Sequence, residues 1–282
     1  MAFATYKMTP RNISLEKGDL KRLIDYVAQK TRESIESQKR EINFEDLNEE
    51  QRESVIRTLD EASKPAVFVY GSDGEELLVY DSSIIDAPEF PERLLRITID
   101  SFIPYQTRMN GTHPRNGMRI DLDFSSAKIL DWQSNVSAPT QNQSEVIIKG
   151  LDDDWRAAVH SFLHKMFTSR ANHRNFLHAA FTYDVYLWLI FMPIYFLGMI
   201  KLDYFVDRFI GDIHTALKVA FYVYSFFVFV NLYRVFIGYI RWTFQSLELK
   251  NVQSTQSKHR KFGMFLVSAI IIPVLLTILM GK

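Results

Sequence analysis

The sequence predicts an α+β cytosolic domain, a mostly antiparallel sheet with flanking helices, followed by an all-α membrane domain of three transmembrane helices. Two observations predict this division. Residues 1–174 combine helix-period and strand-period apolar patterns separated by polar stretches, whereas residues 175–282 contain three long apolar runs. We therefore expect a sensor or interaction domain over 1–174 and a transmembrane domain over 175–282.

Helices are predicted at both ends of the cytosolic domain. Between Asp19 and Arg40 the apolar positions follow the i, i+3, i+4, i+7 spacing of one helix face. Asn48 and Gln51 have the spacing of a capping box, so a second helix is expected from there to about residue 62. A third helix begins after Asp152 and carries an apolar stripe that should pack on the sheet.

Strands are predicted between these helices. Residues 66–70 and 76–80 flank Ser-Asp-Gly, which predicts a hairpin with Gly74 at positive φ. Residues 95–99 and 118–124 alternate apolar with polar side chains, as half-buried strands do, and 145–149 forms a shorter candidate. The polar stretch 134–144 between the last two is expected to be a mobile loop.

Three apolar runs, at about residues 181–200, 219–240 and 262–281, are long enough to cross a bilayer. A spanning helix needs roughly 20 mostly apolar residues. Asp184 and Arg234 are the only charged residues inside the first two runs, and the third has none. Three buried helices of a soluble domain would need a covering layer, and the rest of the sequence is too polar to supply it.

The basic residues predict the orientation in the membrane. Those expected on one side are Lys165, Arg170, Arg174, Arg241, Lys250, Lys258, Arg260 and Lys261, and those on the other are Lys201, Arg208, Lys218 and Lys282. The richer side faces the cytoplasm. Residues 1–22 contain no apolar signal segment. We therefore expect a multi-pass protein of the inner (plasma) membrane, with its N-terminal domain in the cytoplasm and its C-terminus outside.

Motifs for catalysis were not found. The sequence has no glycine-rich phosphate loop, no GxSxG and no HExxH, and it lacks cysteine. His160 and His164 have zinc-compatible spacing, but no third ligand is evident, so they are interpreted as a solvated helix face. We expect no catalytic residues, no metal and no cofactor. The formal net charge is zero, but residues 1–180 carry more acidic than basic residues, and this acidic excess argues against a general nucleic-acid-binding surface.

One soluble stretch has the composition of an anion site. Residues 105–119 place Arg108, His113, Arg115 and Arg119 among asparagines and glycines. Cations with flexible backbone N–H groups suit a phosphate. A nucleotide or short oligonucleotide is the ligand we expect, and the alternative is a charged, exposed loop without a ligand.

Polar residues in and between the spans suggest further roles. Asn231, Gly238 and Arg241 share one face with Arg234, which predicts a pore wall or subunit interface, or a helix contact within one chain. Asp184 and Arg234 are expected to form a membrane ion pair that serves as a gate. Asp203, Asp207 and Asp212 lie on an amphipathic segment and would line an outer vestibule in a ring of subunits.

The layout resembles that of bacterial membrane effectors of anti-phage defence systems, in which a cytosolic sensing domain precedes a few C-terminal spans. The resemblance concerns the architecture of the whole chain and rests on no diagnostic motif. It implies a homo-oligomer that permeabilises the membrane when a nucleotide or oligonucleotide binds. The alternative is a non-conducting membrane anchor that holds a cytosolic partner protein, such as an enzyme, at the lipid bilayer.

Overall fold

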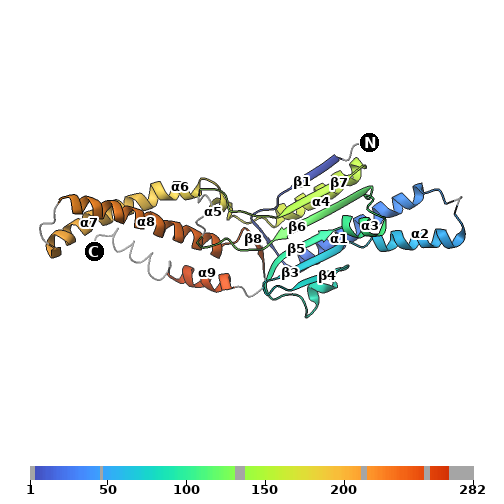
Figure 1. The fold of residues 1–282 in the computed structure, drawn as a ribbon, viewed down its shortest axis with the longest axis horizontal. Coiled ribbons are helices and arrows are strands. Elements are labelled where there is room, and N and C mark those ends of the chain that lie inside the picture. Colours follow the sequence, from blue (N-terminus) through green and yellow to red (C-terminus); the bar gives the residue numbers. More distant parts are fainter. Residues whose placement is uncertain (1–3, 45–46, 131–136, 211–214, 251–254, 267–282) are drawn as a thin grey trace. The chain divides into compact units, whose positions relative to one another are not determined.

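The structure is a computed structural model that describes residues 4–44, 47–130, 137–210, 215–250 and 255–266 (Figure 1). Its chain divides into two compact units. The first comprises Met1–Ser125, Asn142–His173 and Ser246–Ser254, and the second Ser126–Gln141, Arg174–Gln245 and Thr255–Lys282. The chain therefore leaves the first unit after Ser125, after His173 and after Ser254 rather than once, as a simple two-domain order would require.

The first unit contains the sheet and the helices that cover it. Its elements are β1 (Ala4–Met8), β2 (Ile13–Leu15), α1 (Lys17–Glu41), α2 (Glu49–Ala62), β3 (Ala66–Gly71), β4 (Glu76–Val79), η1 (Ser82–Asp86), β5 (Leu94–Asp100), α3 (Phe102–Arg108), β6 (Asn116–Asp123), β7 (Glu145–Gly150), α4 (Asp153–Ser169) and β8 (Leu247–Leu249). Six strands form one antiparallel sheet in the order β1-β7-β6-β5-β3-β4. The predicted antiparallel sheet with flanking helices is therefore confirmed.

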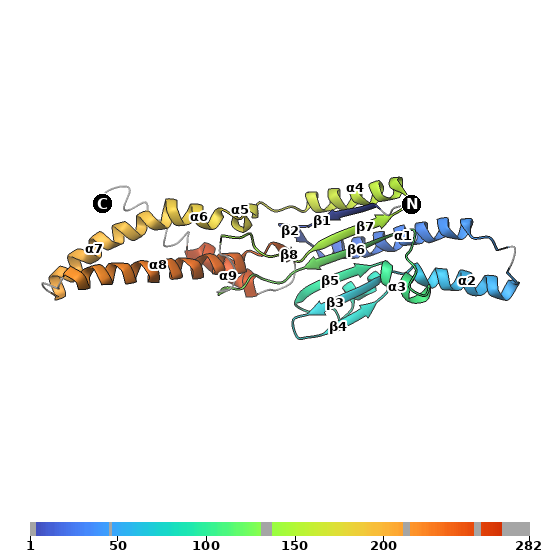
Figure 2. The same ribbon diagram turned by 45° about the horizontal axis from the view of Figure 1, so that its top comes forward.

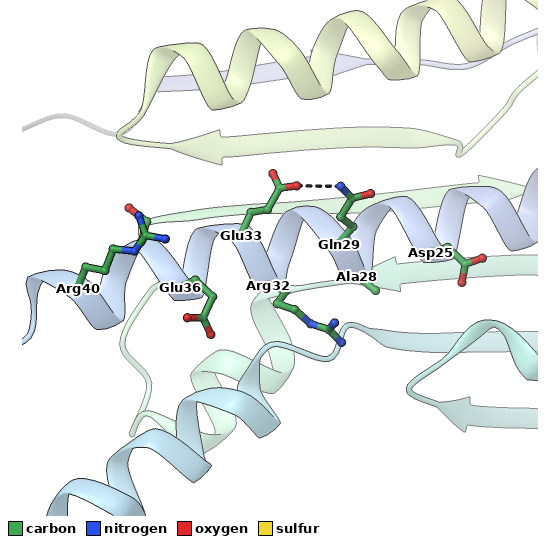
Figure 3. Close-up of a pocket in the computed structure, with 8 residues that line it drawn as sticks. Asp25, Ala28, Gln29, Arg32, Glu33, Glu36 and Arg40 are labelled. Carbon is green, nitrogen blue, oxygen red and sulfur yellow. Dashed lines mark hydrogen bonds between the residues drawn. The ribbon is translucent and has the colours of Figure 1, made fainter.

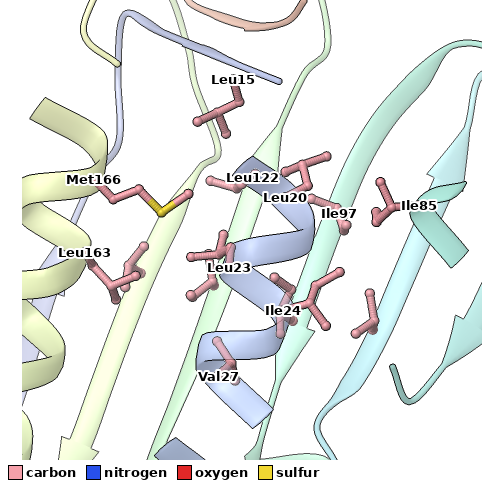
Figure 4. Close-up of a cluster of buried hydrophobic side chains, with 14 of the residues drawn as sticks. Leu15, Leu20, Leu23, Ile24, Val27, Ile85, Ile97, Leu122, Leu163 and Met166 are labelled. Carbon is pink, nitrogen blue, oxygen red and sulfur yellow. The ribbon is translucent and has the colours of Figure 1, made fainter. Parts of the chain in front are cut away.

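Helices α1 and α4 lie along the same face of this sheet (Figures 1 and 2). The apolar stripe of α1, which includes Leu20, Leu23 and Val27, is completely buried, as are Val159 and Leu163 of α4. Figure 4 shows the α1 side chains and Leu163 of α4 beside those of the sheet, among them Ile97 and Leu122. Burying one such aliphatic side chain contributes about 1.5–3 kcal/mol, so the packing of α1 and α4 on the sheet stabilises the unit.

Local sequence signals explain where several elements begin. Asn48 accepts a hydrogen bond from Gln51 N at 2.8 Å, and the Gln51 side chain accepts one from Asn48 N at 3.1 Å, which confirms the predicted capping box. Gly74 has φ of 82° in the β3–β4 turn, where side-chain-bearing residues are disfavoured. Asp152 accepts from Asp154 N and Trp155 N and so begins α4.

A second, two-stranded sheet joins distant parts of the first unit. β2 and β8 run parallel, with Ile13 opposite Leu247 and Leu15 opposite Leu249. The Ile13, Leu15 and Leu247 side chains belong to the same buried cluster as α1 and the large sheet. The segment that follows the second apolar helix is therefore built into the core of the first unit.

The second unit is helical. It contains α5 (Asn175–His178), α6 (Thr182–Tyr186), a π-helical turn η2 (Leu187–Phe191), α7 (Met192–Ile210), α8 (Thr215–Thr243) and α9 (Thr255–Leu266). The π turn ends two residues before Pro193, which has no N–H to donate and would clash with the carbonyl four residues earlier, within the turn, so the helix widens there. Most of the third predicted span, from residue 267 on, lies outside the described residues.

Candidate functional site

Two helices of the second unit are long and apolar enough to cross a membrane. They cover Thr182–Tyr204 and Thr215–Thr243, with mean hydropathies of 1.8 and 1.6. Only 11% of the most apolar window of each is buried by the rest of the chain, whereas a soluble core helix is mostly buried. Leu189, Leu197 and Tyr224 are 65–72% exposed. Apolar surface this extensive needs lipid or another protein against it.

An aromatic cluster joins these helices near the end formed by Thr182 and Thr243, which we call the base. The rings of Tyr183 and Tyr233 lie 4.8 Å apart, and the Tyr233 hydroxyl donates to the Tyr183 carbonyl at 2.6 Å. The Phe191 ring lies 4.4 Å from that of Tyr233. These contacts hold α6 and α8 together, and Tyr233 is almost completely buried.

The two residues of the predicted membrane ion pair directly follow these tyrosines in the sequence. Asp184 accepts a hydrogen bond from the Ser137 hydroxyl at 2.8 Å, a partner that the sequence did not suggest. Arg234 follows Tyr233 on α8. Because Tyr183 and Tyr233 are in contact, α6 and α8 approach each other next to Asp184 and Arg234. The pair itself stays a prediction.

Ser137 belongs to the connecting loop, which we define as residues 126–141 between β6 and β7. This loop belongs to the second unit although both of its flanking strands belong to the first. A Cβ added to Gly238 of α8 would lie closer than 3.0 Å to the carbonyl oxygen of Ile129, a separation that real Cβ atoms essentially never show. The absence of a side chain at Gly238 is therefore what lets the loop backbone lie against α8.

Arg241 binds the backbone of the same loop. Its guanidinium donates to the carbonyls of Leu177 at 3.2 Å, Ala138 at 3.3 Å and Ala179 at 3.5 Å. The side chain is buried, with 8% of the residue exposed. Arginine suits this position because its five N–H groups diverge and can reach carbonyls from separate segments. Gly238 and Arg241, predicted to line a pore or interface, thus contact the chain's own loop.

His178 completes the contact between the loop and the base. Its Nδ1 lies 2.9 Å from the Thr140 hydroxyl, and the Thr140 N–H donates to the His178 carbonyl at 3.2 Å. Burial lowers the pKa of His178 to about 4, helped by the nearby positive charges of Arg241 and Arg174 and opposed by the Phe244 carbonyl. The imidazole is therefore neutral near pH 7.

The remaining polar residues of the spans make local contacts. Asp203 accepts from the Tyr222 hydroxyl and lies 3.7 Å from Lys218 Nζ. Asn231 is exposed and donates to the Phe227 carbonyl of its own helix at 2.8 Å. Asp207 lies on α7, without a described side chain, and Asp212 lies outside the described residues. The predicted vestibule is thus represented by Asp203 alone.

The residues of the predicted anion site occupy three different elements. Arg108 ends α3, Arg119 lies within β6, and Arg115 and His113 lie between them. Arg108 pairs with Glu61 of α2, Arg115 with Glu41 at the end of α1, and Arg119 with Asp121 at 2.7 Å. His113 Nδ1 lies 2.9 Å from Gln106 Nε2. Each of the three predicted arginines therefore has a carboxylate partner, whereas His113 lies against an amide.

Asp121 anchors a charged network on the sheet face opposite α1 and α4. It accepts hydrogen bonds from Thr98, from Arg96 at 3.0 Å and from Arg119. Burial by itself would raise the pKa of Asp121, but these donors outweigh burial and lower it. Burial does raise the pKa of Asp100, although that carboxylate accepts the N–H groups of Phe102 and Ile103 and so caps α3. The network is structural.

A groove of about 600 Å³ runs along α1 (Figure 3). All the residues that line it belong to this one helix, and they are Asp25, Ala28, Gln29, Arg32, Glu33, Glu36, Ser37 and Arg40. Glu33 accepts from Gln29 at 2.9 Å. Alternating charges on one helix face are typical of a solvated surface rather than a ligand site.

Comparisons with family models, curated proteins and solved structures found no match to this chain. Among the described residues, no three His, Asp or Glu side chains are grouped so as to hold a metal ion. The candidate site is therefore defined by geometry alone: the base, where the connecting loop meets α5, α6 and α8.

Sequence reasoning missed this contact for an identifiable reason. The stretch 134–144 was predicted to be a mobile loop from its polar composition, yet Ser137, Ala138 and Thr140 are held by hydrogen bonds. The partners lie between 38 and 103 residues away in sequence, and no local pattern predicts them. Gly238 within an apolar helix was the one local signal, because a glycine there permits close backbone approach.

Proposed function

We propose that this protein is a homo-oligomeric integral membrane protein in which the cytosolic α+β domain controls the permeability of the membrane domain. The first unit senses a cytosolic signal, and the apolar helices form the membrane-disrupting or pore-forming part. The N-terminal domain and α9 lie on the cytoplasmic side of the inner membrane, and the C-terminus lies outside. The architecture of anti-phage membrane effectors corresponds to this arrangement.

The observation that carries the proposal is the path of the connecting loop. Both of its ends are strands of the sheet, and its described residues contact α5, α6 and α8 through Arg241, His178 and Asp184. A passive anchor needs one covalent connection, whereas this loop makes the base depend on the positions of β6 and β7. A charge-assisted hydrogen bond contributes about 1.5–3 kcal/mol, so a few of them suffice for a typical coupling free energy of about 1–3 kcal/mol.

The signal we propose is an anionic ligand that binds Arg108 and Arg115, near the start of β6, in place of their carboxylate partners. The side chains of Arg108 and Arg115 are 36% and 32% exposed, and those of their partners Glu61 and Glu41 are 47% and 60% exposed. Exposed ion pairs contribute only about 0–1 kcal/mol, so a phosphate can displace these carboxylates. Arg115 directly precedes β6, and the other end of β6 leads into the connecting loop.

Oligomerisation follows from the small number of helices. The two described apolar helices, with the third predicted from the sequence, are too few to enclose an aqueous path within one chain. Identical subunits most simply assemble in a closed ring. The exposed apolar surfaces of α7 and α8 then divide between lipid and neighbouring subunits.

Permeability of liposomes that contain the purified full chain tests the proposal. We expect ion flux to depend on added mononucleotides or short oligonucleotides. The double variant Arg108→Gln/Arg115→Gln should weaken ligand binding roughly 100-fold or more. Arg32→Gln/Arg40→Gln removes the same charge from an exposed face of α1 and should leave binding unchanged. Absence of flux under every condition would refute the pore proposal.

Topology is tested separately. The chain has no cysteine, so Ser254→Cys and Asp207→Cys each introduce a unique thiol. An impermeant thiol reagent should label Ser254→Cys only from the cytoplasmic side and Asp207→Cys only from outside. The reverse pattern would exclude the proposed orientation.

A non-conducting anchor for a cytosolic partner is the second candidate. It is favoured by the contacts of the span residues Asp203 and Asn231, whose polar groups have partners within the same chain. An anchor predicts impermeable liposomes together with stable retention of one cytosolic protein. Those two results together would replace the pore proposal.

A further inference from the structure

The strongest unexplained feature outside the candidate site is a cluster of cations and aromatic rings around α9. The Arg174 and Arg260 guanidiniums lie 5.6 and 6.0 Å from the centre of the same Phe244 ring. The His259 ring lies 5.2 Å from that of Trp242, and its Nδ1 lies 2.9 Å from the Tyr239 hydroxyl. Helix α9 is thereby fixed against the final turns of α8.

The opposite face of α9 is open. Gln256, His259 and Arg260 face the contacts just described, with Gln256 only 1% exposed. Lys258, Lys261 and Phe262 are spaced i, i+3, i+4 and are exposed, Phe262 to 59%. An open helix face that combines two ammonium groups with a phenyl ring is typical of helices that lie at a membrane surface.

The charge of this region is uncompensated along the sequence. After Glu248 the chain contains no Asp or Glu, whereas it contains Lys250, Lys258, Arg260 and Lys261 before the predicted third span. Tyr239 and Trp242 lie in the last turns of α8, where amphipathic rings favour the headgroup level. Basic residues next to a span attract the anionic lipids of the cytoplasmic leaflet.

We propose that Lys258 and Lys261 of α9 bind the phosphate of anionic phospholipid headgroups while Phe262 inserts among the acyl chains. This inference rests on the proposed membrane insertion of the chain. Free phosphate offers the two lysines the same anionic oxygens as a lipid headgroup does, but it has no apolar part to contact the exposed phenyl ring of Phe262. A phospholipid provides a phosphate for the two ammonium groups and acyl chains for the phenyl ring, and so the occupant is a lipid.

The test uses the purified full chain in a neutral detergent, titrated with short-chain phosphatidylglycerol, phosphatidylcholine or inorganic phosphate and followed by thermophoresis. We expect phosphatidylglycerol to bind more tightly than the other two. Lys258→Gln/Lys261→Gln should lose about 30-fold in affinity for phosphatidylglycerol, since each lysine near a surface contributes about one kcal/mol.

Lys64→Gln/Lys149→Gln is the matched control, since it removes two exposed lysines from the first unit. It should bind phosphatidylglycerol as the wild type does. Equal binding of the two lipids, phosphate binding as tight as lipid binding, or an equal loss in the control would overturn the proposal. Alkaline extraction of cell membranes, in which an integral protein stays in the pellet, separates that failure from a failure of membrane insertion.

Discussion

The sign of the stability change in Gly238→Ala shows whether the connecting loop is docked on α8. In a helix whose surroundings are open, Gly→Ala stabilises by about 0.5–1 kcal/mol because alanine loses less backbone entropy. At Gly238 the new Cβ would lie closer than 3.0 Å to the carbonyl oxygen of Ile129 and at 3.0 Å from the carbonyl carbon of the same residue. Both of these are backbone atoms, so the loop itself must move.

The expected cost follows from the contacts that this movement disturbs. Ile129 lies in the same loop as Ala138, whose carbonyl accepts from buried Arg241. Losing one or two such charge-assisted contacts in a buried site outweighs the gain in helix propensity, and we expect a net destabilisation of about 2–4 kcal/mol. For a chain of this size that corresponds to a fall in melting temperature on the order of 5 to 10 °C.

Two assays of the detergent-solubilised protein measure this effect. Thermal unfolding gives its sign, and trypsin cleavage after Lys128, the neighbour of Ile129, reports whether the loop has left α8. Gly198→Ala in α7 is the control, because nothing lies within 4 Å of its added Cβ. It should be neutral or slightly stabilising. If Gly238→Ala stabilises the protein as much as Gly198→Ala and cleavage at Lys128 is unchanged, the loop is not docked.

Three further predictions concern titratable and charged groups. Between pH 6.5 and about 4 the unfolded chain binds more protons at His178 than the folded chain does. The stability contributed by the neutral, buried His178 is therefore complete above pH 6.5 and falls by on the order of 3 kcal/mol as the pH drops. His178→Asn should flatten this part of a stability–pH curve, and an unchanged slope would contradict the burial argument. In a double-mutant cycle, Asp184→Asn and Arg234→Gln should show a coupling of about 0.5–3 kcal/mol in oligomer stability, and strict additivity would exclude the gate pair. Asp121→Asn should lower the free energy of unfolding by about 1–3 kcal/mol, since the Arg119 guanidinium loses the nearer of its two carboxylates, the other being Asp100 at 3.8 Å; chemical denaturation measures this, and a neutral effect would show that the network is unimportant.

Local periodicity was sufficient to predict the core of the first unit. The α1 stripe and the alternating positions of β5 and β6 are completely buried at Leu23, Ile97 and Ile120, because burial on one face leaves a direct record in the sequence. Edge strand β1 was missed because four of its five residues are exposed, so no buried face imposes alternation.

The predicted anion loop shows a second limit of sequence reasoning. Its length was overestimated because α3 occupies Phe102–Arg108, and β6 begins at Asn116 rather than at residue 118. Asn116 and Gly117 were interpreted as turn residues, but the Asn116 side chain accepts the N–H groups of Leu151 and Asp152. The composition identified cations correctly, while their partners Glu61 and Glu41 come from helices that the sequence places far away.

In the proposed oligomer, the polar stripe on α8 limits where subunits can meet. Its members near the base, Gly238 and Arg241, contact the chain's own connecting loop, so a neighbouring subunit that bound there would have to displace the loop. Asn231 lies farther from the base by about two helical turns, and its exposed amide donates to the Phe227 carbonyl of its own helix. A subunit interface that uses this stripe would therefore centre near Asn231. In the proposed mechanism, contact with the connecting loop at the base and assembly toward the middle of α8 would then occupy different parts of one helix, so that a movement of the loop reaches the interface along a rigid element.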